Sequence, residues 1–135
     1  MSTIILIIFL HLLGDSVLLG KELRRLKIHK FGYLLKHVGI YTLVFMIFSP
    51  IILGLTIVQG LIFSLLNGVL HLIVDYLLTL VKLKYWTKDI YTYVVIYSIL
   101  EHLIHIAILI GTFLYMFPGV ADLESWLLMA KQIIS

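Results

Sequence analysis

Two copies of the pattern His-x-x-x-Asp lie inside long apolar runs of the sequence. The first copy runs from His11 to Asp15 and the second from His71 to Asp75. Residues four apart lie on one face of a helix, one turn above the other, so each copy presents an imidazole beside a carboxylate. In hydrocarbon an unpaired acid costs roughly 2.5–3.5 kcal/mol. Two such pairs predict a polar site held between helices, and a metal site fits them best.

Further groups of the same chemistry are expected to join these pairs. Glu101 and His105 form another acid–histidine pair four residues apart, and His37 lies between the two motifs. The candidate metal ligands are His11, Asp15, His37, His71, Asp75, Glu101 and His105. These nitrogen and oxygen donors suit a divalent metal such as zinc, manganese, iron or nickel rather than a metal that prefers thiolates.

The charge of this ligand set is compatible with one ion or two. Three carboxylates against two divalent ions leave one positive charge, which a bridging hydroxide would cancel. That arithmetic fits a two-metal hydrolytic centre of the kind held in four-helix bundles. It fits equally a single ion whose histidines are oriented by neighbouring carboxylates.

The same residues also have a simpler interpretation, as packing groups. A lone histidine in a membrane helix often only makes a hydrogen bond, and a His–Asp pair is satisfied without any ion. Because the pairs and His37 are spread over all the predicted spans, a metal or proton site is favoured. His102 points about 100° away from Glu101 on a helix and is predicted to lie outside the ligand set. His29, in a basic segment, is predicted to lie at the surface.

The composition indicates a membrane protein. The chain has 135 residues, 62% of them hydrophobic, and a mean hydropathy of +1.15. Soluble domains contain roughly 45–50% apolar residues, and a domain of this size could not hide such an excess. The absence of cysteine excludes thiolate metal sites, iron–sulfur clusters and disulfides. By its length the chain is a single transmembrane domain, 1–135.

Four stretches are long enough to cross a bilayer core, which takes about 20 helical residues. They are 3–20, 33–55, 59–81 and 90–117. The predicted fold class is therefore all-α, a polytopic membrane four-helix bundle made of two helical hairpins. Ser49-Pro50, late in the second stretch, predicts a kink or a re-entrant turn. A C-terminal interfacial helix is predicted over 122–134, with Asp122 as its N-cap and Trp126 as its anchor.

The basic residues are concentrated in two connections. Nine of the ten Lys and Arg residues fall within 21–36 and 82–88. The positive-inside rule places both connections in the cytoplasm and both termini outside, in the cytoplasmic (inner) membrane of the cell. Segment 21–36 is predicted to form a short helix on the inner surface, in contact with anionic lipid. Since the flanking spans account for these charges, no nucleic-acid partner is predicted. A homodimer is left open.

The two halves of the chain resemble each other. In each half a Lys follows the Asp of the motif, at Lys21 and Lys82, and the next span carries a histidine, at His37 and His105. Both motif helices would cross the membrane in the same direction. This pattern favours a duplicated hairpin, with chance similarity as the alternative.

These motifs resemble a prokaryotic family of small membrane proteins known only as domain of unknown function three-three-zero-seven. The family's first helix carries H-x-x-G-D-F-x-x-Q, where this chain has His11-Leu-Leu-Gly-Asp15 followed by Ser16 and Leu19 in place of the aromatic and polar residues. The family's D-Q-x-x-H is similar to Glu101-His102-Leu-Ile-His105 here. The resemblance covers nearly the whole chain and implies a shared fold and polar site, without implying a reaction.

Several functions are compatible with such a site. The first is a metal-dependent hydrolase acting on a lipid-linked or amphipathic substrate. The second is a transporter that relays protons or passes a metal through the same residues. The third is an interaction module whose polar residues only hold its helices together. Bis-histidine haem ligation is a fourth, which the acids beside each histidine disfavour.

Overall fold

The computed structural model describes residues 3–17, 20–118 and 130–134. Within these ranges the chain forms helices and no strand. The elements are α1 (Thr3–Leu12), which continues into a short π-helix η1 (Leu13–Val17), then α2 (Lys21–Leu26), α3 (Phe31–Leu53), α4 (Ile57–Trp86) and α5 (Tyr91–Met116). The predicted all-α class is confirmed. The predicted interfacial helix lies largely outside the described residues, of which 130–134 are helical and exposed.

Helices α3, α4 and α5 are each long and apolar enough to cross a membrane. They contain 23, 30 and 26 residues. At 1.5 Å per residue they measure about 35, 45 and 39 Å, against a hydrocarbon core of about 30 Å. Three of the four predicted spans are therefore confirmed, and α3 begins at Phe31, two residues before its predicted start.

The prediction for the first span is wrong in its length. The apolar helix there covers only Thr3–Ser16, and Gly20 has extended backbone with φ −60° and ψ 153°. Fourteen helical residues reach about 21 Å, which is shorter than a bilayer core. The helix winds into a π-helix from Leu13 onward, where the Gly-Asp of the first motif lies.

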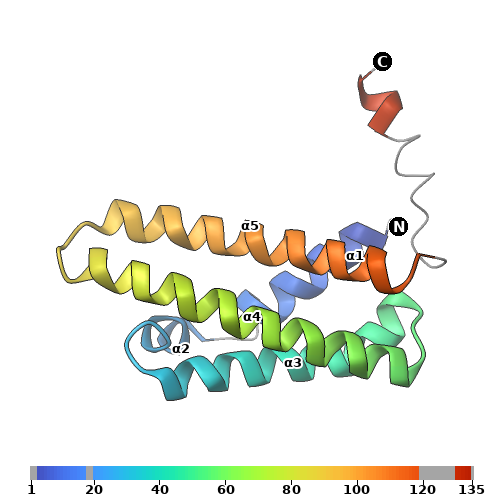
Figure 1. Ribbon diagram of the computed structural model, residues 1–135, viewed down its shortest axis with the longest axis horizontal. Helices are drawn as coiled ribbons and strands as arrows, with labels where there is room; N and C mark the ends of the chain where they lie inside the picture. The colour runs from blue at the N-terminus through green and yellow to red at the C-terminus, as the bar shows by residue number, and fades with distance from the viewer. Residues whose placement is uncertain (1–2, 18–19, 119–129, 135) are drawn as a thin grey trace.

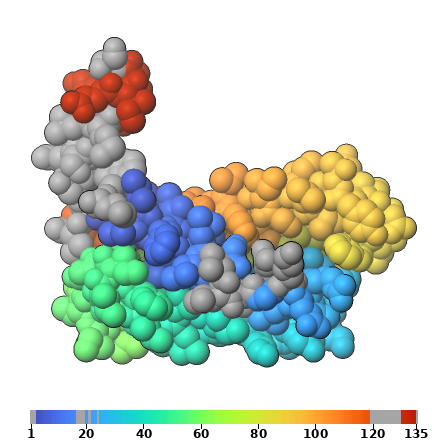
Figure 2. All heavy atoms as spheres, turned by 180° about the vertical axis from the view of Figure 1, so that it is seen from behind, coloured from blue at the N-terminus to red at the C-terminus, as the bar shows by residue number. Residues whose placement is uncertain are grey.

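The three long helices run side by side, with α4 between α3 and α5 (Figure 1). Helix α1 packs against α3 and α5, and it lies on the face shown in Figure 2. The connection that holds α2 and the connection between α4 and α5 lie at the same end of the bundle. There the rings of His29 and Trp86 meet edge to face, with centroids 5.3 Å apart. His29 is exposed, as predicted.

A tight turn joins α3 to α4 at the opposite end. Helix α3 continues through Pro50 to Leu53. Of the two predicted alternatives, a kink or a re-entrant turn, the re-entrant turn is therefore wrong, because the chain reverses only at Gly54. Gly54 has a φ of +67°, a left-handed conformation that glycine adopts without a steric penalty. The Thr56 side chain then caps α4, in a reciprocal capping box with Gln59. Aromatic packing fills the bundle near this turn, where the rings of Phe45, Phe113 and Phe117 surround Phe63.

Helices α3 and α4 approach each other closely at Gly68. A Cβ atom at Gly68 would lie 2.3 Å from Thr42 Oγ1, whereas a Cβ at Gly39 would meet nothing within 4 Å. We expect Gly68→Ala to cost about 1–3 kcal/mol in free energy of unfolding, because overpacking forces neighbouring side chains or backbone to shift. Gly39→Ala, the matched control in α3, should be neutral or stabilising by up to about 1 kcal/mol.

Thermal unfolding of the detergent-solubilised variants measures both effects. The double variant Gly68→Ala/Thr42→Ala should recover most of the loss, because the clashing Oγ1 atom is gone. Equal stability of Gly68→Ala and Gly39→Ala would show that α3 and α4 do not pack as closely as described.

Candidate metal centre

The structure brings all seven predicted ligand residues together inside the bundle. Each of them is 3% exposed or less. They come from five elements, namely α1 and η1 for the first motif, α3 for His37, α4 for the second motif and α5 for the Glu101–His105 pair. The predicted convergence of separate segments on one polar cluster is therefore present.

The most crowded atom of the cluster is Nε2 of His37. It lies 2.9 Å from Asp15 Oδ1 and 3.2 Å from Asp75 Oδ2. It also lies 3.1 Å from Nε2 of His71 and 3.3 Å from the Nζ atom of Lys27. An imidazole nitrogen carries at most one hydrogen or one lone pair directed outward. These four contacts cannot all be hydrogen bonds at once. The two carboxylates and the two imidazoles have the chemistry of ligands around a cation, and the fourth contact, the Lys27 ammonium, is itself a cation.

Three overlapping groups could hold a metal ion. They are Asp15 with His37 and His71, His71 with Asp75 and His105, and His11 with Asp15, His102 and His105. In the first group the atoms lie 2.9, 3.1 and 3.6 Å apart. Ligand atoms bonded at about 2.1 Å to a tetrahedral or octahedral ion lie about 3.0–3.4 Å apart. The first group therefore has the spacing of a coordination sphere.

Several buried polar atoms of the cluster make no hydrogen bond among the described residues. Both carboxylate oxygens of Asp15 are among them, as are Nε2 of His11 and Nε2 of His105. A buried polar group left unsatisfied costs about 1–3 kcal/mol, and more when it is charged. These atoms face one another, so a cation bound among them would satisfy several at once. The donor set thus fits a divalent metal.

The π-helix η1 and Gly14 explain how Asp15 reaches the cluster. A π-helical turn re-aims side chains relative to an α-helix and is common at functional sites. A Cβ at Gly14 would lie 3.2 Å from the Tyr41 ring, so glycine allows α3 to approach here. Asp15 then directs Oδ1 toward His37 and Oδ2 toward His102, the two distances being 2.9 and 3.2 Å.

Tyr41 supports the cluster in a way that was not predicted from the sequence. Its ring stacks on His71 with centroids 4.0 Å apart, and His71 stacks on His105 at 3.9 Å. The Tyr41 hydroxyl lies 3.3 Å from Nδ1 of His11. These contacts fix the orientation of three rings. Tyr41 lies four residues after His37, on the same helical face, and this spacing could have indicated from the sequence that it lies beside the cluster.

Two lysines enter the cluster, which corrects the prediction that both lie in surface connections. Lys27 is 7% exposed and Lys82 is 1% exposed. Lys27 Nζ donates to Asp75 Oδ2 at 3.1 Å and lies 3.6 Å from Glu101 Oε1. Lys82 forms a short ion pair with the other Glu101 oxygen. Glu101, predicted as a metal ligand, is instead held by the two lysines and belongs to none of the three groups.

The charge on Lys27 is favoured by its surroundings. Burial alone would lower the pKa of this ammonium, but the carboxylates of Asp75, Glu101 and Asp15 outweigh it and raise the pKa above its ordinary value. Lys27 precedes the first residue of α3 by four positions and lies outside the three long apolar helices. It therefore adds a positive charge to the edge of the cluster.

The lysines change the charge arithmetic of the site. Three carboxylates and two ammonium groups leave one net negative charge when the histidines are neutral. One divalent ion with one bound hydroxide would make the cluster neutral, whereas two ions with a hydroxide would leave it doubly positive. A single ion is therefore favoured over the two-metal arrangement that the sequence allowed.

His102 lies closer to the cluster than its helical position predicted. Its Nδ1 atom is 3.2 Å from Asp15 Oδ2, and its side chain is 40% exposed. It was placed outside the ligand set because it points away from Glu101. Helix α1, however, packs against α5 and brings Asp15 to the side on which His102 lies. This residue is the point at which the buried cluster reaches the surface of the described chain.

The predicted duplication of the hairpin stays a prediction, but corresponding residues of the two halves make similar contacts. In each hairpin the histidine of the second helix contacts the aspartate of the first. His37 lies 2.9 Å from Asp15, and His105 lies 3.3 Å from Asp75. His71 of the second hairpin also lies 3.6 Å from Asp15 of the first. Equivalent residues of the two halves therefore form a single site between them.

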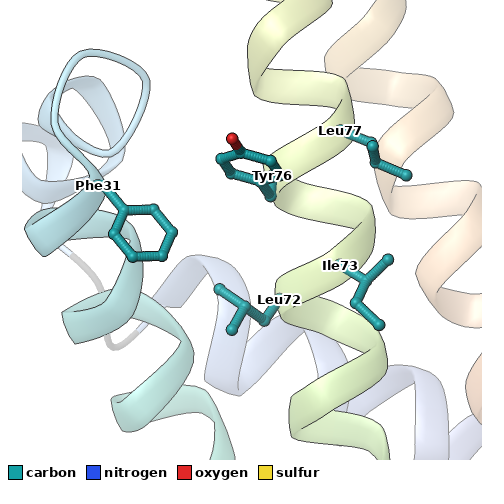
Figure 3. A pocket seen from close by; sticks show the side chains of 5 residues that line it. All are labelled: Phe31, Leu72, Ile73, Tyr76 and Leu77. Carbon is teal, nitrogen blue, oxygen red and sulfur yellow. The ribbon is translucent and has the colours of Figure 1, made fainter.

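An open groove of about 480 Å³ lies elsewhere, between the start of α3 and the outer side of α4. Figure 3 shows Phe31 facing Leu72 and Tyr76, with Ile73 and Leu77 further round α4. The ring centroids of Phe31 and Tyr76 are 5.9 Å apart. None of the predicted ligands lines this groove, and its lining is apolar apart from the tyrosine hydroxyl. It is not a site of polar chemistry.

Comparisons with known proteins gave no relative. Neither protein-family models, nor curated proteins, nor solved structures match this chain. The resemblance drawn from the motifs stays a prediction. What is established is a membrane protein with three helices long and apolar enough to cross a bilayer, and with a buried His/Asp cluster that could hold a metal ion.

Proposed function

We propose that this protein binds one divalent metal ion inside the membrane and uses it to hydrolyse a lipid-linked or amphipathic substrate. Zinc, manganese and iron suit the nitrogen and oxygen donors. The observation that carries the proposal is the crowding at Nε2 of His37, which has two carboxylate oxygens and a second imidazole nitrogen within 3.2 Å. No arrangement of hydrogens satisfies all three contacts, and a cation held by Asp15, His37 and His71 would satisfy two of them.

The residues around the ion supply the other parts of a hydrolytic site. A bound divalent ion lowers the pKa of a coordinated water and stabilises negative charge in the transition state. Asp15, His37 and His71 would hold the ion, and Tyr41 keeps the His71 ring in place. Glu101 stands outside the ligand groups, and its Oε1 makes no hydrogen bond among the described residues. It is the candidate general base.

Access to this site favours a substrate that comes from the membrane. The ligand groups are buried between apolar helices, and His102, 40% exposed, is their outermost member. Many large apolar side chains on α3, α4 and α5 are exposed on the outside of the bundle, where lipid would cover them. A substrate with a lipid tail could therefore approach through the bilayer.

Hydrolysis by purified protein in vesicles tests the proposal. We expect metal-dependent release of the headgroup from a lipid ester or a lipid phosphoester, lost on chelation and restored by added zinc or manganese. Asp15→Asn should abolish the activity, whereas Glu22→Gln, at an exposed residue of α2, should leave it unchanged. Protein that holds one ion per chain yet hydrolyses neither substrate class would contradict the enzymatic part of the proposal.

Transport is the second candidate, and the buried ion pairs favour it. Lys27 and Lys82 join the carboxylates and imidazoles into one polar chain across the cluster. Chains of acids and histidines in membrane helices are the usual material of proton relays. This alternative predicts flux of protons or metal ions into liposomes that is lost in Asp15→Asn and Asp75→Asn, with no hydrolysis.

We propose that the protein lies in the cytoplasmic membrane, with its two basic connections on the cytoplasmic side. The structure places both connections at the same end of the bundle, which supports a common side (Figure 1). Exposed Lys30, Lys36 and Lys88 remain available to anionic lipid, while Lys27 and Lys82 do not. The chain has no cysteine, so single cysteines placed at Lys30 and Lys88 report the side by labelling from one face of sealed vesicles. Labelling of the two from opposite faces would contradict the arrangement.

A further inference from the structure

Lys27 occupies an unusual place for a lysine in a surface connection. It follows the last residue of the short helix α2 and begins a turn that ends at His29. Its neighbours Arg25 and His29 are exposed, but Lys27 is 7% exposed. Its side chain leaves the surface and enters the polar cluster, so the connection delivers a positive charge to the site.

The atoms that Lys27 contacts are those that would coordinate a metal ion. Its Nζ lies 3.1 Å from Asp75 Oδ2 and 3.3 Å from Nε2 of His37. Asp75 and His37 each belong to one of the groups that could hold an ion. An ammonium at this position repels a divalent ion and uses up the same acceptors. Lys27 and the metal therefore compete for one negatively charged place.

Lys27 is attached to the bundle through a short segment, so it can leave the polar cluster. Lys82 cannot leave in this way. Lys82 lies within α4, a helix of 30 residues, and cannot move without it. Lys27 is carried by a six-residue helix that packs on α3 and by a turn whose His29 ring meets Trp86 of α4. Backbone hydrogen bonds from Lys27, His29 and Lys30 all go to carbonyls within this segment, at Leu23 and Leu26. The segment is thus a local unit that could shift on α3.

We propose that Lys27 is an internal counter-cation that holds the acids together in the metal-free protein and is displaced when the metal binds. This inference rests on the proposed metal site and adds a residue that sets its affinity. Once Lys27 has left, three carboxylates and Lys82 carry two net negative charges, which one divalent ion cancels. Displacement also moves the α2 segment, so that metal occupancy is signalled at the surface of the membrane.

Zinc binding by the full-length variants tests the proposal. Zinc affinity is measured in detergent by competition with a chromophoric chelator. Because Lys27→Gln removes a like charge next to the ion, we expect at least about tenfold tighter zinc binding. Lys30→Gln, at an exposed lysine of the same segment, should bind as the unmodified protein does. Lys27→Gln should also be less stable than Lys30→Gln without zinc and regain the difference with zinc, because a ligand that binds the folded state stabilises it.

A second measurement uses the native lysine and does not depend on the folding of the Lys27 variant. Arg25→Cys places a single thiol on exposed α2, and its rate of labelling should change when zinc is added. Unchanged labelling, or zinc binding by Lys27→Gln no tighter than by Lys30→Gln, would overturn the proposal while leaving the metal site intact. Absence of zinc binding in every variant would instead overturn the metal site and this inference with it. Binding by Lys27→Gln alone would support the competition.

Discussion

Purified His71→Ala protein should carry almost no divalent metal, whereas the unmodified protein should carry about one ion per chain, because one ion with a bound hydroxide balances the charge of the cluster and two ions would not. His71 belongs to two of the three ligand groups, and its Nε2 lies between Asp15 and Asp75 at 3.6 and 3.4 Å. Loss of a group that only orients a ligand already lowers metal affinity by about 10–100-fold, so loss of a ligand should lower it by at least about 100-fold.

Elemental analysis of gently purified protein measures this effect. His29→Ala is the matched control, because His29 is exposed and its ring meets the Trp86 ring, away from the cluster. That variant should keep the full metal content. The reduced affinity should be confirmed by zinc titration of the metal-free proteins. Unmodified protein that is metal-free, fully stable and unaffected by zinc would contradict the site, and the cluster would then be a packing network.

Glu101→Leu should strongly destabilise the folded protein. It leaves the Lys82 ammonium buried, 1% exposed, without its carboxylate partner. Removing one member of a buried ion pair typically costs about 3–5 kcal/mol, because the remaining charge is uncompensated. Lys82→Met should cost less, since Glu101 keeps Lys27 at 3.6 Å as a second positive charge. The two partners of one ion pair are therefore expected to differ in effect.

The double variant Lys82→Met/Glu101→Leu separates loss of the pair from loss of one partner. Replacement of a whole buried pair by apolar residues is often neutral or stabilising by about 1–4 kcal/mol, so the double variant should be more stable than Glu101→Leu alone. Unfolding midpoints in a denaturing detergent titration give the comparison. Because Glu101 belongs to none of the ligand groups, zinc binding should survive in the double variant. A double variant as unstable as Glu101→Leu would show that Lys82 and Glu101 do not form the buried ion pair described.

The sequence by itself determined the class of the protein and the types of its functional residues. Apolar runs longer than 20 residues require spanning helices, and a spacing of four places His71 and Asp75 on one face whatever the helix packs against. The same spacing holds for His11 and Asp15 across the π-helical turn, where the two side chains are 3.8 Å apart. These features are local, so composition and periodicity predict them. The first span was predicted too long because apolarity does not reveal that the helix ends before Gly20.

The tertiary structure alone decided which other residues join the site. Lys27 and Lys82 looked like surface charges, because nothing in their neighbours in sequence shows that each reaches a buried acid. His102 joined through the packing of α1 on α5, and Tyr41 through its stacking on His71. The rotation of each helix about its axis, and the path of a connection over the bundle, depend on contacts between distant segments. Those contacts turn a set of plausible ligands into a cluster with one net negative charge, and they favour one ion over two.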